Sequence, residues 1–326
     1  MLRDRYHRLH NYLRISLTDK CNFKCSYCMP VSQHSCLQQR QLMSADEIEK
    51  IAAEFVSLGI NKIRLTGGEP LVRNDFGDIA FRLAKLPVER VLTTNGSLLH
   101  RHIETLVNAR FSSVNVSLDS LNPHAFASIT QVNHFHRVWK NILLLLEHRI
   151  RVKINVVAIN GFIQQEILRF IELTGNLPLH IRFIEFMPFK GNGWNSEKVI
   201  TASELFRIVC NEYDVVKLKD EPHSTARKYK VIGYEGTFAF ITTMSRQFCG
   251  ECNRIRLTAD GKIKNCLFGK EELDLLAALR TGMPLEPVIR QSLLLKHQTM
   301  GGQFTHGYRN TEAHKIFNRS MVNIGG

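Results

Sequence analysis

Short β-rich runs alternate regularly with helical patterns over residues 12–187, and this alternation constrains the fold more than any other feature. A capping box formed by Ser44 and Glu47 opens the first helix, which ends at Gly59. Strands that alternate with helices predict a parallel sheet with right-handed crossovers. Six such units are two fewer than a closed eight-stranded barrel needs, so we expect an α/β fold, a partial open (β/α)6 barrel of the TIM type. The expected strands are 12–17, 60–66, 90–94, 113–118, 152–157 and 181–186, and the further helices are 75–86, 98–109, 138–148 and 164–174.

The composition changes after Pro188, where residues 190–195 resemble a linker. We therefore predict two domains, the partial barrel over 1–189 and a smaller C-terminal domain over 190–326. Within the second, a capping box formed by Thr201 and Glu204 opens a short helix, and 229–243 is strand-like with a glycine-containing turn.

The charge balance favours an anionic partner. Lys and Arg number 43 against 30 Asp and Glu in 326 residues, a formal net charge of +13. Composition alone leaves open whether that partner is a nucleotide or a nucleic acid. The longest apolar run, 142–146, is far too short for a membrane span, and the polar, basic N-terminus has no secretory signal. We expect a cytoplasmic protein.

Six of the eight cysteines fall into two tight sets, which favours metal binding over disulfides. The first set is Cys21, Cys25 and Cys28, directly after the first expected strand. Three thiolates hold three irons of a cubane cluster and leave the fourth open, whereas ferredoxins usually close all four positions. An open metal position is what catalysis needs. The alternative is a structural zinc site, for which His34 and Cys36 are the nearby candidates for a fourth ligand.

The second set is Cys249, Cys252 and Cys266. A zinc ribbon would need another pair of cysteines, but no cysteine follows Cys266, so a second iron–sulfur cluster with one open iron is favoured. Arg254 and Arg256 lie on alternate residues of one extended segment beside this set. They predict an anion that meets them there, or else a solvated strand face.

Polar residues follow several of the expected strands. Residues 67–69 follow the second strand, 94–96 the third and 119–120 the fourth. Barrels of this type carry their chemistry at the C-terminal strand ends and in the loops that follow them, so we expect the site at that end.

The segment 66–70 reads Thr-Gly-Gly-Glu-Pro, Tyr27 lies inside the first cysteine set, and the chain ends in two glycines. Together with both cysteine sets, these motifs resemble the GTP 3′,8-cyclases, a family of radical S-adenosylmethionine enzymes, over essentially the whole chain. The segment 31–36 departs from the acidic, glycine-containing stretch that many members have there. The resemblance implies two 4Fe-4S clusters and S-adenosylmethionine as cofactors. It implies a lyase that cyclises GTP to 3′,8-cyclo-7,8-dihydro-GTP in the first step of molybdenum cofactor biosynthesis.

The resemblance also assigns roles to individual residues. The first cluster cleaves S-adenosylmethionine, the open iron of the second meets the guanine base, and the two terminal glycines thread toward the active site. The implied cluster ligands are Cys21, Cys25, Cys28, Cys249, Cys252 and Cys266. The implied S-adenosylmethionine contacts are Tyr27, Gly68, Ser117 and Met187, with Gly68 leaving room for the methionine amino group. The implied GTP contacts are Arg14, Arg64, Thr93, Lys153, Arg254 and Arg256.

The implied partners are an electron donor such as a flavodoxin or ferredoxin, the downstream cyclic pyranopterin monophosphate synthase and a second copy of the chain, with no nucleic acid or membrane. Two alternatives remain. One is a radical S-adenosylmethionine enzyme that modifies a peptide or another substrate, and the other is a basic zinc protein that binds nucleic acid.

Overall fold

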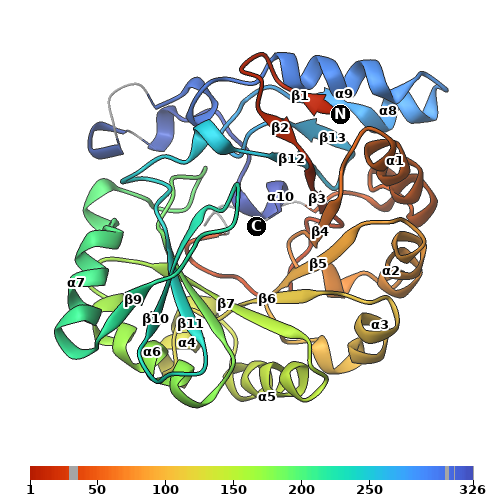
Figure 1. Cartoon of the computed structure of the whole chain (residues 1–326). Helices are drawn as coiled ribbons and strands as arrows, with labels where there is room; N and C mark the ends of the chain where they lie inside the picture. Colours follow the sequence, from red (N-terminus) through yellow and green to blue (C-terminus); the bar gives the residue numbers. More distant parts are fainter. Residues whose placement is uncertain (29–35, 305–307, 312, 326) are drawn as a thin grey trace.

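The computed structural model describes residues 1–28, 36–304, 308–311 and 313–325. All six expected strands are present, and they pair in parallel in chain order (Figure 1). The segment 31–36 departs from the stretch that many members of the resembled family have, and its residues 31–35 lie outside the described residues. The strands are β3 (Tyr12–Ser16), β4 (Lys62–Thr66), β5 (Glu89–Thr94), β6 (Ser113–Ser117), β7 (Arg151–Ala158) and β8 (His180–Glu185).

The crossover helices pack on the outer side of this sheet (Figure 1). Ser44 caps α1 (Ala45–Ser57) with the predicted capping box. The expected helix at 98–109 is instead a 3-10 turn followed by α3 (Ile103–Asn108). Among the described residues of this layer, the helix α4 (Pro123–Thr130), which is capped by Asn122, was not expected from the sequence. The other helices of this layer are α2 (Phe76–Ala84), α5 (Phe135–Glu147) and α6 (Ile167–Asn176).

The C-terminal part of the chain continues the same sheet at both edges. At one edge β12 (Arg254–Leu257) pairs in parallel with β3, and at the other β11 (Thr237–Ile241) pairs in parallel with β8. Over the described residues this gives one twelve-stranded, mostly parallel sheet of the α/β TIM type. The residues assigned to a second domain therefore share the sheet of the first, and the boundary at 189 stays a prediction. The outer strands are β13 (Lys262–Lys264) and β14 (Leu273–Asp274) beyond β12, and β10 (Ala226–Val231) and β9 (Val215–Lys217) beyond β11.

The strands and helices are arranged as a ring around the middle of the molecule, and the remaining elements complete this ring (Figure 1). Thr201 caps α7 (Ala202–Glu212) with the second predicted capping box. The short helix α10 (Met321–Ile324) lies inside the ring, close to the described end of the chain. No helix in the described part of the chain is long and apolar enough to cross a membrane. The other elements are β1 (Leu2–Arg3), β2 (Leu9–His10), α8 (Leu275–Arg280) and α9 (Leu285–Leu294).

The inner strands alternate between the helix side and the inside of the ring. In β7, Val152, Ile154 and Val156 are buried in the core, whereas Lys153 and Asn155 are only partly buried. Residues of a strand point alternately to opposite faces, so the polar half of each strand is turned toward the enclosed side. This alternation creates a polar interior.

Candidate active site

The parallel register aligns basic residues across neighbouring strands. Arg256 on β12 pairs with Arg14 on β3, which pairs with Arg64 on β4. On the opposite side of the ring, Lys153 on β7 pairs with His180, and Asn155 pairs with Arg182, both on β8. Directly paired residues of parallel strands point to the same face, so the register itself concentrates positive charge inside the ring.

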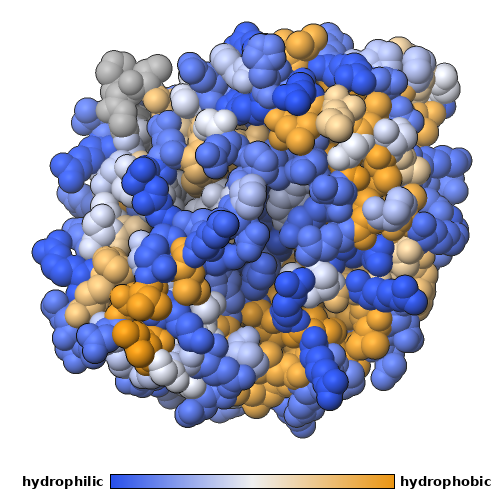
Figure 2. Space-filling view, viewed as in Figure 1, coloured by the Kyte–Doolittle hydropathy of each residue, from blue (hydrophilic) through white to orange (hydrophobic). Residues whose placement is uncertain are grey.

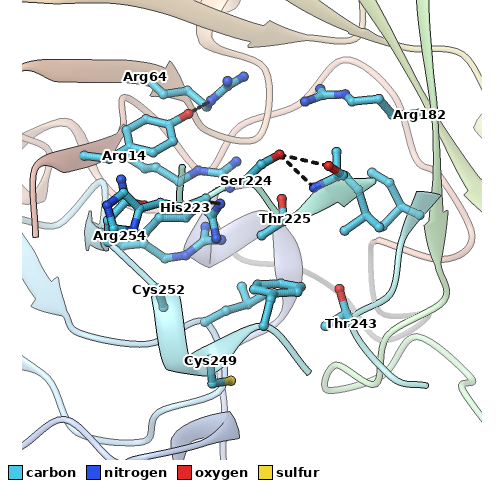
Figure 3. Close-up of a pocket in the computed structure, with 18 of the residues that line it drawn as sticks. Arg14, Arg64, Arg182, His223, Ser224, Thr225, Thr243, Cys249, Cys252 and Arg254 are labelled. Atoms are coloured by element: carbon cyan, nitrogen blue, oxygen red, sulfur yellow. Dashed lines mark hydrogen bonds between the residues drawn. The ribbon is translucent and has the colours of Figure 1, made fainter. Parts of the chain in front are cut away.

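These side chains line a cavity of about 400 Å³. Figure 2 shows a hollow ringed by hydrophilic residues near the centre of this face, and Figure 3 shows the guanidinium groups of Arg64 and Arg182 facing each other across it. The residues named from the sequence that line it are Arg14, Arg64, Lys153, Met187, Arg254, Arg256, Cys249, Cys252 and Cys266.

The basic groups of the cavity are held close to one another and away from water. Burial, followed by repulsion from Arg182, lowers the pKa of Lys153 to about 7. Burial and the nearby Arg64 lower the pKa of Arg182 to about 9, and burial and Arg254 lower that of Arg256 to about 10. Among the described lining residues, Glu221 is the one carboxylate. Such a site disfavours its own positive charges until a polyanion enters.

Two residues of the inner strands orient Arg64. Its Nη1 donates a hydrogen bond of 2.7 Å to Oγ1 of Thr93, and its Nε donates to the hydroxyl of Tyr12. Burial raises the pKa of Tyr12, but Arg64 and Arg14 outweigh burial, and the pKa falls to about 8. Thr93 therefore contacts Arg64 rather than lining the cavity itself.

The second cysteine set forms one end of the same cavity, where Figure 3 places Cys249 and Cys252 beside Arg254. All three are free thiols, and Cys249 lies close enough to Cys252 and Cys266 for their charges to interact. The thiols are thus gathered but not cross-linked, which fits a cluster held by three cysteines.

The first cysteine set lies in the loop after β3. Its three thiols are free, and burial raises the pKa of Cys21 to about 11 and that of Cys28 to about 12. Burial also raises the pKa of Cys25, and the charges of Cys28 and Cys21 add to that effect. Three partly buried thiols close enough to repel one another as thiolates would need a positive partner, and iron is one that cysteines can bind.

The described residues contain no group of three Cys, His, Asp or Glu side chains arranged as ligands of a single metal ion. The cysteines of a four-iron cluster each bind a different iron, so they do not have to converge on one point.

The structure gives Gly68 a steric role that the sequence did not reveal. A Cβ at this position would lie 2.4 Å from the carbonyl oxygen of Lys20, which belongs to the chain itself. The backbone N–H groups of Gly68 and Glu69 also donate to the carbonyl oxygens of Thr18 and Lys20, at 2.7 and 2.8 Å. The segment therefore packs directly on the backbone that leads into Cys21, and only glycine fits there.

The other residues expected to contact S-adenosylmethionine lie at strand ends or beside the first cysteine set. The hydroxyl of Tyr27 donates to Asp119 at 2.7 Å, and Asp119 also accepts a hydrogen bond from the backbone of Val157. Ser117 ends β6 and is partly buried, whereas Met187 follows β8 and reaches the cavity. The first cysteine set, Tyr27, Gly68 and Ser117 do not line the cavity.

The sequence reasoning missed several lining residues. Arg182 faces the cavity from β8, and Asn155 accepts a hydrogen bond from its Nη2. The loop 221–225 covers another side, where Nη2 of Arg254 donates to the carbonyl oxygen of His223 at 3.2 Å. The alternation of polar and apolar residues in 180–185 was a usable signal for Arg182, but the loop carried no comparable pattern.

Comparisons with known proteins agree with this arrangement. Residues 15–174 match the family profile "Radical SAM superfamily", and residues 179–301 match "Molybdenum Cofactor Synthesis C". The structure of SuiB from Streptococcus suis bound to S-adenosylmethionine superposes with a TM-score of 0.60 at 16% identity, covering 87% of this chain and 68% of that one. At that identity the similarity shows the fold alone.

Curated relatives match over most or all of the chain. The mitochondrial GTP 3′,8-cyclase of Arabidopsis thaliana is 40% identical over 100% of this chain and 84% of its own length. Molybdenum cofactor biosynthesis protein 1 of Mus musculus is 44% identical over 89% of this chain, which spans about half (46%) of that longer protein. GTP 3′,8-cyclase of Alkaliphilus oremlandii is 38% identical over 100% of both chains. As the motifs predicted, the chain belongs to the GTP 3′,8-cyclase family of radical S-adenosylmethionine enzymes, whose cofactors are S-adenosylmethionine and iron–sulfur clusters.

Proposed function

We propose that this protein is a lyase that converts GTP to 3′,8-cyclo-7,8-dihydro-GTP, the first step of molybdenum cofactor biosynthesis. Family membership supports the reaction, and the cavity supports the substrate. The observation that carries the proposal is one cavity that combines the aligned basic side chains with the second cysteine set. A substrate for it must carry several negative charges at one end and a metal-binding group at the other, and GTP has both.

The basic side chains would bind the triphosphate. Arginines offer bidentate hydrogen bonds to phosphate oxygens, and a lysine offers a point charge. Thr93 and Tyr12 hold the Arg64 guanidinium in place before the substrate arrives, so less rotamer freedom is lost on binding. The Nζ of Lys153, whose pKa is lowered to about 7 by burial, would take up a proton beside the phosphates. The proposed GTP contacts are Arg14, Arg64, Lys153, Arg182, Arg254 and Arg256, with Thr93 positioning Arg64.

Cys249, Cys252 and Cys266 would hold the second 4Fe-4S cluster, with its open iron toward the guanine base. The first cysteine set would hold the other cluster, and Tyr27, Gly68, Ser117 and Met187 would surround S-adenosylmethionine. When bound, the first cluster and S-adenosylmethionine supply the radical chemistry that joins C3′ of the ribose to C8 of guanine. The task of the protein is to position the substrate, to neutralise its charge and to exclude water.

The finer organisation is part of the same proposal. Residues 1–189 would form a partial (β/α)6 barrel, and 190–326 a smaller C-terminal domain that adds strands at both of its edges. The protein would work in the cytoplasm with a flavodoxin or ferredoxin as electron donor, as a homodimer, and would pass its product to cyclic pyranopterin monophosphate synthase.

An anaerobic turnover assay tests the function. Cluster-reconstituted protein receives reductant and S-adenosylmethionine with or without GTP, and 5′-deoxyadenosine and nucleotides are separated by chromatography because the product is an isomer of GTP. We expect GTP-dependent 5′-deoxyadenosine and a matching new nucleotide peak. Arg64→Met should weaken this dependence on GTP, whereas Arg101→Met, at an exposed arginine, should not. If S-adenosylmethionine is cleaved at the same rate with and without GTP and no new nucleotide forms, the substrate would be another molecule, such as a peptide.

A further inference from the structure

We propose that Lys296 is a positioning residue of the second cysteine set, which ties its two chain segments together and makes the cluster there easier to reduce. No role for Lys296 was expected from the sequence. The inference rests on the proposed function in one respect, that Cys249, Cys252 and Cys266 hold a cluster.

Lys296 connects both segments that carry this set. Its side chain is 2% exposed, and its Nζ lies 3.7 Å from Sγ of Cys252. The same Nζ donates to the carbonyl oxygen of Arg254 at 3.2 Å and to that of Asn265 at 2.5 Å. Arg254 lies two residues after Cys252, and Asn265 directly precedes Cys266. One ammonium group, distant from both in sequence, therefore holds the two ligand-bearing segments at a fixed spacing.

The positive charge of Lys296 has no carboxylate beside it. In the described part of the chain its hydrogen bonds go to two backbone carbonyls and a sulfur, and no acidic side chain forms an ion pair with it. A buried ammonium group is costly unless an anion compensates it. The sulfur of Cys252, ionised when it binds iron, is the anion within reach.

A neighbouring arginine shows the contrast. Nη1 of Arg8 donates to the carbonyl oxygens of Cys249 and Gln298 at 2.7 Å, so it also supports the second set. The charge of Arg8, however, is compensated by an ion pair with Asp4, whose Oδ2 lies 2.6 Å from Nε of Arg8. Lys296 differs from Arg8 in that no acidic side chain of the described residues forms an ion pair with it.

The two cysteine sets lie in opposite electrostatic surroundings. Nζ of Lys296 lies 3.7 Å from Sγ of Cys252, and Arg254 begins the strand directly after this cysteine segment. Near the first set, the buried carboxylates of Glu69 and Asp119 lie close enough to interact electrostatically with Cys21 and Cys25. A positive neighbour at the second set and negative neighbours at the first predict different redox behaviour for the two clusters.

The physical consequence is a change in reduction potential. A cluster held by these cysteines would take up one electron from the external reductant of the assay, with no bond broken and no proton transferred by the protein. The ammonium group of Lys296 would stabilise the added negative charge, because the reduction potential of an iron–sulfur cluster depends on nearby charges and on hydrogen bonds to its sulfurs. Lys296 therefore shifts the equilibrium toward the reduced cluster.

The test uses the full-length chain with Cys21, Cys25 and Cys28 replaced by alanine, so that only the second cluster can assemble. Anaerobic redox titration followed by electron paramagnetic resonance gives its midpoint potential, and iron analysis gives its occupancy. Three variants are compared in this background. Lys296→Gln keeps hydrogen-bond donors but loses the charge, Lys296→Arg keeps the charge, and Lys270→Gln removes an equal charge from an exposed position.

We expect Lys296→Gln to shift the reduction equilibrium about tenfold or more toward the oxidised cluster, which is about 59 mV for one electron. Lys296→Arg and Lys270→Gln should keep the parental midpoint. A parental midpoint in Lys296→Gln with intact iron would overturn the proposal, as would loss of iron from both Lys296→Gln and Lys296→Arg. Loss of iron from Lys296→Gln alone would support the tie between the segments. If the background chain itself binds no cluster, the proposed function fails at this set instead.

Discussion

Nη1 of Arg256 donates a hydrogen bond of 2.7 Å to the backbone carbonyl oxygen of Gly325. Arg256 lines the cavity, so this bond holds the end of the described chain against the cavity wall. Gly325 has a φ of +84°, and a Cβ there would lie 2.9 Å from Cγ2 of Thr66 and 3.1 Å from Cβ of Ser16. Both neighbours end inner strands, at the edge where the chemistry was expected. The predicted threading of the tail thus has a basis at Gly325, whereas Gly326 lies outside the described residues.

Replacing Gly325 by alanine should impair turnover more than stability. An alanine here would have to keep a left-handed backbone conformation, which costs about 1–2 kcal/mol, and its Cβ would press against Thr66 and Ser16. We therefore expect GTP-dependent 5′-deoxyadenosine formation to fall roughly tenfold. Gly77→Ala is the control, because a Cβ there meets nothing within 4 Å. Equal turnover in the two variants would show that the tail does not act at the site.

Removing the hydroxyl of Thr93 should weaken GTP binding through Arg64. Thr93→Val keeps the shape of the side chain but removes Oγ1, which accepts the 2.7 Å hydrogen bond from Nη1 of Arg64. Because a hydrogen bond to a charged group contributes about 1.5–3 kcal/mol, KM for GTP should rise roughly tenfold. The value of kcat should change less. A double-mutant cycle with Arg64→Met checks the mechanism. Thr93→Val should raise KM little further in a protein that already carries Arg64→Met, because Thr93 acts through Arg64. Independent, additive effects would contradict the positioning role.

GTP binding should be coupled to protonation of Lys153. Burial and then Arg182 lower its pKa from 10.5 to about 7, so most of this amine is neutral at pH 8 before GTP binds. Phosphate oxygens favour the charged form, so binding at pH 8 should take up a proton, and affinity should fall as the pH rises above about 7. Calorimetry in buffers of different ionisation enthalpy measures this uptake, and Lys153→Met should reduce it. Uptake that is the same in both proteins would assign the proton to another group.

The same group makes a prediction for stability without GTP. Since the pKa of Lys153 is lowered on folding, the unfolded chain binds more protons between pH 7 and pH 10.5. The contribution of this residue to the free energy of unfolding therefore rises with pH across that window. Thermal denaturation over this pH range measures the effect: the increase of the melting temperature with pH should be smaller in Lys153→Met than in the parent protein. The same pH dependence in both proteins would argue against the lowered pKa.

Removing one ligand of the second set should halve the iron content. Cys252→Ala leaves the first set intact, so reconstituted protein should retain one of two clusters and lose GTP-dependent turnover. Cys210→Ala is the matched control, since that thiol is exposed, on α7, and was assigned no role. A full iron content in Cys252→Ala would exclude this residue as a ligand.

Local patterns were sufficient for the inner strands and for most of the helices that connect them. The six β-rich runs and both capping boxes, at Ser44 and Thr201, lie where they were expected, because side-chain periodicity and capping depend on residues close in sequence. The missed helix α4 is eight residues long, and the helix expected at 98–109 is interrupted by a 3-10 turn. Such short elements depend on tertiary packing more than on their own pattern.

The sharing of one sheet by both halves of the chain was not visible in the sequence. A composition change at 190–195 suggested a separate domain, yet β11 and β12 pair in parallel with β8 and β3. Strand pairing between segments far apart in sequence depends on how the whole chain packs, and no local pattern encodes it.

The parallel α/β fold, the two cysteine sets and most of the basic residues of the cavity could be predicted from the sequence, because these depend on periodicity and residue chemistry. Which of these residues meet depends on the folded chain. The tertiary structure aligned Arg256, Arg14 and Arg64 through strand register, brought Arg182 opposite them, and placed Lys296 against Cys252, 44 residues away. The physical reason is that the surroundings of a buried charge are set by segments distant in sequence, and it is these surroundings that fix its pKa and its partners.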